Sequence, residues 1–246
     1  MSLLEDAEVL LLDIEGTIAP VSFVFEVLFP YAAAQVETFL EVHGKEPLVQ
    51  ADLAALRDEY EADTGRGLIL PDWSGPEPTA ATPYIRFLIA ADRKSTGLKS
   101  LQGKIWEQGY LSGAYRSQIF ADVRPAFERW TRAGKRIYIY SSGSIQAQRL
   151  LFEHTEQGDL RGYLSRYFDT TSGPKLEADS YRRIAGQIAV DAAQILFASD
   201  HRGELRAAQQ AGLRTVLVVR PGNALAEGTD FPVVRSFAPA PAGDES

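Results

Sequence analysis

Short runs of apolar residues recur along the chain and are separated by longer stretches with helical periodicity. The runs cover 9–12, 137–140, 195–198 and 215–219, and polar residues do not alternate through them. Continuous apolar runs of this length are typical of strands buried on both faces of a parallel sheet. Because a helix-like stretch precedes each later run, the pattern predicts an α/β fold with a doubly wound parallel sheet.

The stretch from 21 to 120 has a different pattern. Its apolar residues follow helical spacing, and no run typical of a buried strand occurs in it. The final residues are mostly proline, alanine, glycine and acidic residues, which indicates a flexible tail. We therefore predict a core domain over 1–20 and 121–236, an inserted helical cap domain over 21–120, and a tail over 237–246.

Polar residues stand where the predicted strands end or just before a predicted helix. In an open parallel sheet, ligands bind at the carboxyl ends of the strands, near the point where the strand order reverses. Residues far apart in the sequence are therefore expected to meet at one edge of the sheet. The set comprises Asp13, Glu15, Ser141, Ser142, Lys175 and Asp200.

The three acidic residues of this set indicate a metal site. Asp13 and Glu15 are two residues apart, so they point the same way along an extended chain. Together with Asp200 they repel one another unless a hard cation lies between them, and such oxygen ligands suit Mg²⁺. A bound metal offsets the charge of a phosphate and polarises it for attack by a carboxylate. The sequence thus predicts a magnesium-dependent phosphatase with Asp13 as nucleophile and Glu15 as general acid and base.

Each cluster also has a purely structural interpretation. Asp13 and Glu15 can be an ordinary loop pair, and a single lysine such as Lys175 is usually solvated. The segment 141–144 can bind phosphate at a helix N-terminus or simply cap that helix. Asp200 can cap the next helix, whereas Glu204, four residues later on the same face, can support the metal site.

Composition and charge narrow the classes of function. The 246 residues include no cysteine, which excludes disulfides, thiolate zinc sites and cysteine nucleophiles and is compatible with a reducing cytoplasm. A net charge of −8 argues against binding to nucleic acid or anionic membrane. Residues 1–8 carry three acids and no base, unlike a secretory signal, and the apolar runs are too short to span a bilayer. We expect a cytoplasmic protein that acts on a small phosphate ester.

In this order, the clusters resemble the haloacid dehalogenase superfamily of phosphohydrolases. That pattern has a nucleophilic Asp two residues before a second acid, then a strand-end Ser or Thr, a Lys and a distal metal-binding acid. Most phosphatases of the superfamily have Asp where this chain has Glu15. With Glu at that place, the segment 13–17 is similar to the enolase-phosphatase E1 branch of methionine salvage. The segments 106–110, 120–126, 138–144, 173–181 and 218–223 also resemble that branch.

The resemblance implies a reaction in two steps. The enzyme would enolise 2,3-diketo-5-methylthiopentyl-1-phosphate and then remove the phosphate to give the acireductone 1,2-dihydroxy-3-keto-5-methylthiopentene. It also implies one Mg²⁺ per subunit, a monomer and a helical cap that sets specificity. The sequence leaves open two alternatives, a phosphatase of another small phosphate monoester and a silent protein that only binds phosphorylated ligands.

The resemblance also implies roles for individual residues. Asp13, Glu15 and Asp200 would form the metal site, Glu15 through its side chain or its backbone carbonyl. Ser141, Ser142 and Lys175 would hold the substrate phosphate. In the cap, Tyr84, Arg86 and Lys94 are either substrate contacts or ordinary residues of an amphipathic helix.

Overall fold

The computed structural model describes residues 3–223 and 228–239, and its contacts group into two compact units. The sheet unit comprises Met1–Phe23 and Arg116–Ser246. The helical unit comprises Val24–Tyr115.

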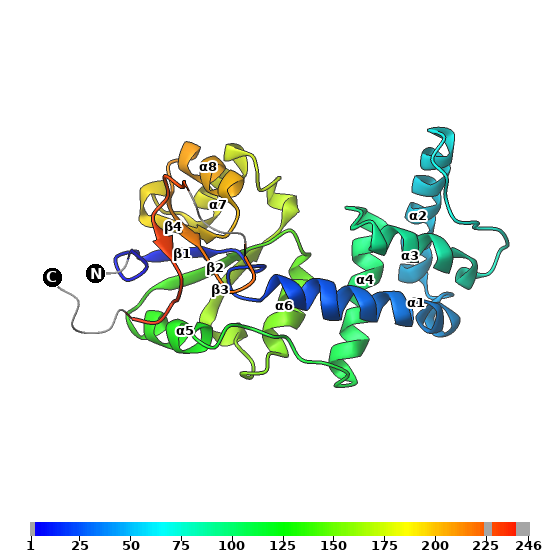
Figure 1. The fold of residues 1–246 in the computed structure, drawn as a ribbon, viewed down its shortest axis with the longest axis horizontal. Helices are drawn as coiled ribbons and strands as arrows, with labels where there is room; N and C mark the ends of the chain where they lie inside the picture. The colour runs from blue at the N-terminus through cyan, green and yellow to red at the C-terminus, as the bar shows by residue number, and fades with distance from the viewer. Residues whose placement is uncertain (1–2, 224–227, 240–246) are drawn as a thin grey trace. The chain divides into compact units, whose positions relative to one another are not determined.

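The sheet unit is built on six strands, and every neighbouring pair is parallel (Figure 1). Their order across the sheet is β3-β2-β1-β4-β5-β6. The chain therefore moves outward from β1 to β2 and β3, then returns to the other side of β1 and continues outward. The fold class predicted from the sequence is confirmed, and the strand order reverses between β1 and β4. The strands are β1 (Val9–Leu12), β2 (Arg136–Tyr140), β3 (Leu164–Phe168), β4 (Ile195–Ser199), β5 (Arg214–Val218) and β6 (Val233–Val234).

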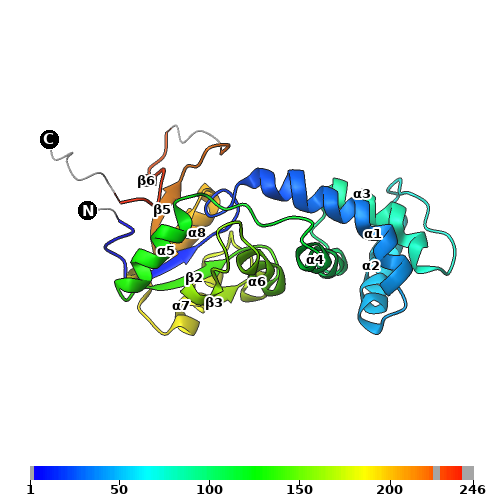
Figure 2. The ribbon, with the colours of Figure 1, turned by 90° about the horizontal axis from the view of Figure 1, so that it is seen from below.

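Helices cover both faces of this sheet, with α5 on one side and α7 and α8 on the other (Figures 1 and 2). In β1, Leu10 and Leu12 pack into the apolar cluster on one face, whereas Val9 and Leu11 pack into the cluster on the other. Each fully buried side chain of this size stabilises the fold by roughly 1.5–3 kcal/mol relative to exposure. Burial on both faces explains why the central strands are uninterrupted apolar runs. The helices are α5 (Val123–Arg132), α6 (Ile145–Glu153), α7 (Ala178–Ile188) and α8 (Arg202–Gln210), with short 3-10 turns η3 (Arg161–Tyr163), η4 (Thr170–Ser172) and η5 (Ala192–Gln194).

Two strands of the sheet were not predicted. β3 lies at one edge and pairs only with β2, and its Ser165 and Arg166 are exposed. β6 lies at the other edge and contains only Val233 and Val234. Edge strands need not be apolar throughout, so neither segment has the pattern that identifies the central strands.

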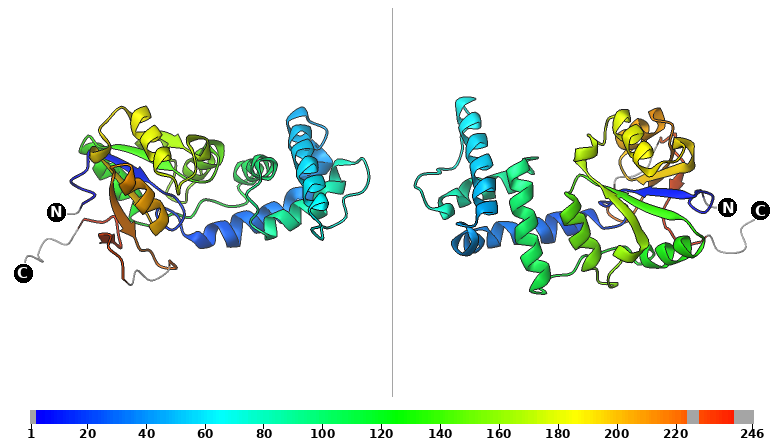
Figure 3. Two further views of the ribbon diagram at one scale, coloured as in Figure 1. Left: turned by 90° about the horizontal axis from the view of Figure 1, so that it is seen from above. Right: turned by 180° about the vertical axis from the view of Figure 1, so that it is seen from behind.

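The helical unit packs its helices around one apolar cluster. Helix α1 contacts α3 and α4, and α4 also packs along α2, as the two views of Figure 3 show. Residues 24–115, all of which the structure describes, form helices and no strand. The α-helices are α1 (Phe29–His43), α2 (Pro47–Gly65), α3 (Thr82–Ala90) and α4 (Thr96–Leu111). A π-helix, η1 (Phe23–Leu28), precedes α1, and a 3-10 turn, η2 (Pro78–Ala81), precedes α3.

One helical stretch, Phe23–His43, has the length and composition of a membrane span. It contains 21 residues, and its most apolar window has a mean hydropathy of 1.3. The expectation that no stretch is long enough was therefore wrong, because Glu26 and Pro30 interrupt the apolar run without ending the helix. Within that window 39% of the residues are buried, and Val36 and Leu40 belong to the apolar cluster of the helical unit. Packing inside the protein thus accounts for part of its apolar character.

The predicted tail begins with an ordered residue. Phe237 is buried, its ring centroid lies 5.4 Å from that of Trp130, and its main-chain nitrogen donates to Asp122 Oδ2 at 2.7 Å. The start of the tail was therefore placed too early, because a single aromatic residue anchors it. Residues 240–246 lie outside the described part of the chain.

Candidate active site

Asp13 stands at the point where the strand order reverses. Its main-chain nitrogen donates to the carbonyl of Ala198 in β4 at 3.0 Å, which extends the β1–β4 ladder by one residue. On the other side, the register of β1 with β2 puts Asp13 one residue beyond the pair of Leu12 and Ile139. Neighbouring strands lie about 4.8 Å apart, so both β2 and β4 end beside Asp13. Its side chain is buried, and only 4% of its surface is exposed.

Lys175 neutralises part of the charge at Asp13. Its ammonium lies 2.6 Å from Asp13 Oδ1 and 2.7 Å from Glu204 Oε2. Burial alone would lower the pKa of Lys175, but the two carboxylates raise it by more, so the side chain stays charged. Two tyrosines hold the loop that carries this lysine: Tyr181 donates to the carbonyl of Lys175 and Tyr140 to that of Gly173, both at 2.8 Å.

Negative charge still exceeds positive charge around this lysine. Burial raises the pKa of Asp200 to about 7, with further contributions from the charges of Asp13 and Glu204. Burial, followed by the charge of Asp13, also raises the pKa of Glu204, which accepts a hydrogen bond from Ser199 Oγ at 3.0 Å. Three carboxylates around one ammonium make this edge of the sheet attractive to a cation.

Gly16 closes the loop after β1 tightly against Asp200. Its φ of +70° lies in the region that favours glycine. A Cβ at this position would lie 2.1 Å from Asp200 Oδ2, a contact that no side chain tolerates. The absence of a side chain at residue 16 is therefore what lets the Asp200 carboxylate approach the loop that carries Asp13.

The serine segment after β2 is preorganised by side chains. Ser141 is buried and its Oγ accepts from the main-chain nitrogen of Gly143 at 3.1 Å. Gln148 Nε2 donates to the carbonyls of Gly143 and Phe168 at 2.8 and 2.9 Å. The cap of α6 is Ser144, which accepts from the nitrogen of Ala147. Helix capping thus accounts for the presence of Ser144. It does not account for Ser141 or for the half-buried Ser142.

The same distinction applies to Asp200. The N-cap of α8 is His201, whose ring nitrogen accepts from the main-chain nitrogen of Glu204 at 3.3 Å. The interpretation of Asp200 as a helix cap was therefore wrong. Its carboxylate instead points to the loop after β1, where it approaches Gly16.

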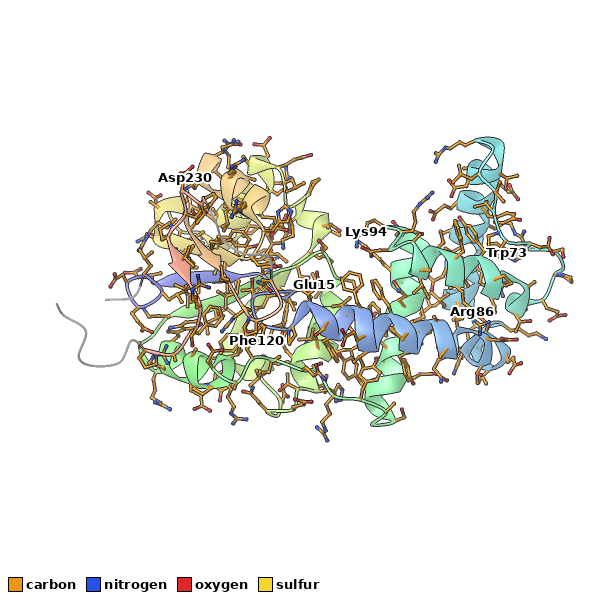
Figure 4. All side chains as sticks on the ribbon, in the orientation of Figure 1. Glu15, Trp73, Arg86, Lys94, Phe120 and Asp230 are labelled. Carbon is orange, nitrogen blue, oxygen red and sulfur yellow. The ribbon has the colours of Figure 1, made fainter. Side chains whose placement is uncertain are left out.

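A metal can be tested against the donors that the structure brings together. Among residues 3–223 and 228–239, no three His, Asp or Glu side chains are grouped as a metal site. The carboxylates of Asp13 and Asp200, which sense each other's charge, are nevertheless hard oxygen donors of the kind that Mg²⁺ prefers. Glu15 is exposed in the loop after β1 (Figure 4). The donor set fits Mg²⁺ if a main-chain carbonyl and water complete its coordination.

The structure adds Tyr140 and Tyr181 to the surroundings of the predicted site. It removes Tyr84 from the predicted substrate contacts of the cap. Glu204 was expected to support the metal, but its direct partner is Lys175; only its spacing from Asp200 signalled it. The loop contacts of Tyr140 and Tyr181 had no sequence signal. Tyr84 is fully buried, and its hydroxyl donates to Asp63 at 3.5 Å, so it belongs to the core of the helical unit.

The other two candidates, Arg86 and Lys94, are labelled in Figure 4, and both pair with residues of the helical unit. Arg86 donates to the carbonyl of Ala33 at 2.9 Å and pairs with Glu37. Lys94 pairs with Asp92 at 2.7 Å. Arg86 also lines a cavity of about 300 Å³ with apolar side chains that include Phe25, Phe29 and Ile89.

Comparison with known proteins decides the family. The model of haloacid dehalogenase-like hydrolases matches residues 7–212. Enolase-phosphatase E1 of Synechococcus elongatus is 58% identical over 93% of this chain and 95% of its own length. Enolase-phosphatase E1 of Monosiga brevicollis is 45% identical over 95% of this chain and 83% of its own length. This chain belongs to the enolase-phosphatase E1 family. The crystal structure of the Unknown transcript 4 protein of Saccharomyces cerevisiae matches with a TM-score of 0.76 and 35% identity, covering 94% of this chain and 98% of that one.

Membership in the enolase-phosphatase E1 family confirms two predictions from the sequence. The resemblance rested on Glu15 and on segments outside the general phosphatase pattern, and the relatives bear it out over nearly the whole chain. The class of enzyme, a phosphatase among haloacid dehalogenase-like hydrolases, is also confirmed. The roles of the individual site residues stay predictions.

Proposed function

We propose that this chain converts 2,3-diketo-5-methylthiopentyl-1-phosphate to the acireductone of methionine salvage, by enolisation followed by phosphate hydrolysis. The observation that carries the proposal is the buried contact of Asp13 with Lys175 at the point where the strand order reverses. Membership in the enolase-phosphatase E1 family supports the choice of substrate.

In the hydrolytic step, a carboxylate oxygen of Asp13 attacks the phosphorus atom. The bond from phosphorus to the substrate oxygen breaks, and an aspartyl-phosphate forms. Glu15 gives its proton to the leaving oxygen and then takes a proton from the water that hydrolyses the aspartyl-phosphate, which restores both carboxyl groups. Lys175, Ser141 and Ser142 hold the phosphate oxygens, and the preorganised serine segment supports that assignment.

Haloacid dehalogenase-like hydrolases and enolase-phosphatases generally depend on Mg²⁺. We assign one ion per subunit to the carboxylates of Asp13 and Asp200 and to Glu15 through its main-chain carbonyl. When bound, Mg²⁺ offsets the charge of the phosphate and stabilises the enolate oxygen. The surplus of negative charge around Asp200 supports this assignment.

The enolisation step also needs a base near a carbon next to a carbonyl. We assign this role to Glu15, because its side chain is exposed and lies two residues from the nucleophile. A Glu15→Gln variant tests this role together with the role of Glu15 in hydrolysis. It is expected to form no enol from the diketo phosphate.

The decisive assay follows the absorbance of the enol and the release of phosphate together. Wild-type enzyme should show the enol appear and decay as phosphate accumulates. Phosphate release without an enol intermediate, or faster turnover of ordinary sugar phosphates, would favour a phosphatase of another small monoester.

The nucleophile is tested with Asp13→Asn, which removes the attacking oxygen and is expected to abolish phosphate release. Asp52→Asn is the matched control, because Asp52 is also buried and pairs with Lys104 at 2.5 Å in the helical unit. The control should keep its phosphatase activity. Full activity of Asp13→Asn would contradict the mechanism.

We further propose that the protein is a cytoplasmic monomer whose partner is the small phosphate ester and neither nucleic acid nor a membrane. The net charge of −8 supports weak affinity for polyanions. Light scattering after size-exclusion chromatography tests the monomer.

A further inference from the structure

The loop that follows β1 is held from two directions. Within the loop, the carbonyl of Ile14 accepts hydrogen bonds from the main-chain nitrogens of Thr17, Ile18 and Ala19. The carbonyls of Gly16 and Thr17 accept from side chains that lie about two hundred residues later in the chain. These two contacts make the segment after β5 part of the environment of the nucleophile.

Arg220 provides one of the two contacts and is itself firmly fixed. Its Nε donates to the carbonyl of Thr17 at 3.0 Å, and its Nη1 pairs with Asp122 Oδ2 at 2.7 Å. The guanidinium also lies 4.6 Å from the ring centroid of Phe120, labelled in Figure 4, and 4.3 Å from that of Phe237. With only 5% of its surface exposed, Arg220 is a core residue, and its loss would disturb the whole fold.

Asn223 provides the other contact and is placed differently. Its Nδ2 donates to the carbonyl of Gly16 at 2.8 Å, and the side chain is only half-buried. The position that a Cβ of Gly16 would take lies 3.2 Å from Asn223 Nδ2 and 2.1 Å from Asp200 Oδ2. The amide of Asn223 and the carboxylate of Asp200 therefore flank the same residue of the loop.

We propose that Asn223 is a positioning residue of the active site, which fixes the peptide of Gly16 and thereby the placement of Asp13 and Glu15 relative to Asp200. The inference rests on the proposed role of Asp13 as nucleophile. Gly16 has no side chain to pack and its main chain is intrinsically free, so an external hydrogen bond has a large influence on its conformation. A shift of the loop by about 1 Å can reduce turnover by roughly a hundredfold.

The kinetic test uses Asn223→Ala and Asn223→Asp. Both remove the donor to Gly16, and the second keeps the shape of the side chain. We expect each variant to lower kcat by about tenfold to a hundredfold with little change in KM, and to weaken Mg²⁺ binding measured by titration calorimetry without substrate.

Gln157→Ala is the matched control. Gln157 Nε2 also donates to a main-chain carbonyl, that of Phe120 at 3.1 Å, in the same unit. The control should lower the melting temperature about as much as Asn223→Ala but leave kcat and Mg²⁺ affinity unchanged. Equal effects of the two variants on all three quantities would reduce Asn223 to a structural role and overturn the proposal.

Asn223 is the only asparagine in the chain, which allows a direct spectroscopic test. Selective ¹⁵N labelling of asparagine gives one side-chain amide group, seen as a pair of proton correlations at one nitrogen shift. We expect slow hydrogen exchange for it in the wild-type protein and a shift on addition of Mg²⁺. Rapid exchange at a random-coil position would contradict the contact. This signal does not depend on turnover, so it separates a failure of this inference from an active Asp13→Asn variant, which would refute only the proposed function.

Discussion

Both units of the protein bury an ionic cluster, but the two clusters differ in their balance of charge. In the helical unit, Asp63 accepts two hydrogen bonds from Arg93 Nη2 at 2.8 and 2.6 Å and a third from Arg66 at 3.2 Å. Glu59 pairs with the same Arg93 at 3.1 Å. Two acids thus face two bases, and the hydrogen bonds that Arg93 donates to Asp63 raise the pKa of Arg93 despite the cost of desolvation.

In the sheet unit, by contrast, Lys175 is the one ammonium among the described residues within ion-pair distance of Asp13 and Glu204, and Asp200 adds a third negative charge. Burial, followed by this surplus of negative charge, raises the pKa of Asp200 and of Glu204. Where positive and negative charges balance, the groups of a cluster stabilise one another. A cluster with surplus negative charge instead attracts a cation or a cationic ligand from outside the chain. The balance of charge therefore distinguishes a structural ion-pair cluster from a candidate active site.

Removing the ammonium from the unbalanced cluster should have the largest effect. Lys175→Ala removes the ammonium that we propose to hold the phosphate beside Asp13, so kcat/KM is expected to fall by about 10²- to 10³-fold or more. Steady-state assays of phosphate release measure the change.

Lys104→Ala serves as the control for that variant, because it removes a lysine from a comparable contact with Asp52 in the helical unit. It should retain wild-type kcat/KM. A loss of activity of the same size in both variants would show that the charge difference between the clusters does not separate structure from function.

Breaking the balanced cluster should affect stability instead of turnover. Asp63→Asn removes the fully buried carboxylate that pairs with Arg93, whereas the partly exposed Arg93 keeps its ion pair with Glu59, so the loss is expected to cost about 1–3 kcal/mol. Urea denaturation measures the change in the free energy of unfolding. The folded variant should keep its kcat, and a fall in kcat with unchanged stability would contradict the assignment.

The smallest expected effect is the pH dependence of stability without metal. The pKa of Asp200 is about 7 in the folded state against 3.8 for the ordinary carboxyl. Between these values the folded state binds more protons than the unfolded state, so the free energy of unfolding falls as pH rises through this window. Asp200→Asn should reduce this slope in urea midpoints measured with a chelator. Added Mg²⁺ should stabilise the wild type more above pH 7 than at pH 5, because only the ionised carboxyl binds it. An identical slope in the variant would count against the charge surplus at Asp200.

The central strands could be predicted because both faces are buried. Leu10 and Leu12 face one helical layer, Val9 and Leu11 face the other, and the sequence between them is therefore apolar throughout. β3 could not be predicted in this way, since Arg166 at the sheet edge is exposed.

For the candidate active site, the sequence predicted which polar residues follow the strands. It did not predict which of their atoms are in contact. Asp13 and Lys175 are separated by 162 positions, and their contact depends on a loop that Tyr140 and Tyr181 hold through main-chain carbonyls. Every residue has a main-chain carbonyl, so the residue type at the accepting position does not reveal such a hydrogen bond. For the same reason, nothing at Gly16 indicated that Asn223 would bind it.

The position of the loop contacts along the chain has a consequence for biosynthesis. Domains begin to fold during synthesis from the N-terminal side. The helical unit is one continuous segment, Val24–Tyr115, so all of its contacts are available early. Asp13 emerges before it, yet the residues that hold its loop, Arg220 and Asn223, are translated about two hundred residues later. A ribosome-bound chain that lacks them carries Asp13, the proposed nucleophile, in a loop that is not yet held, so we expect catalytic competence only after Asn223 has been synthesised.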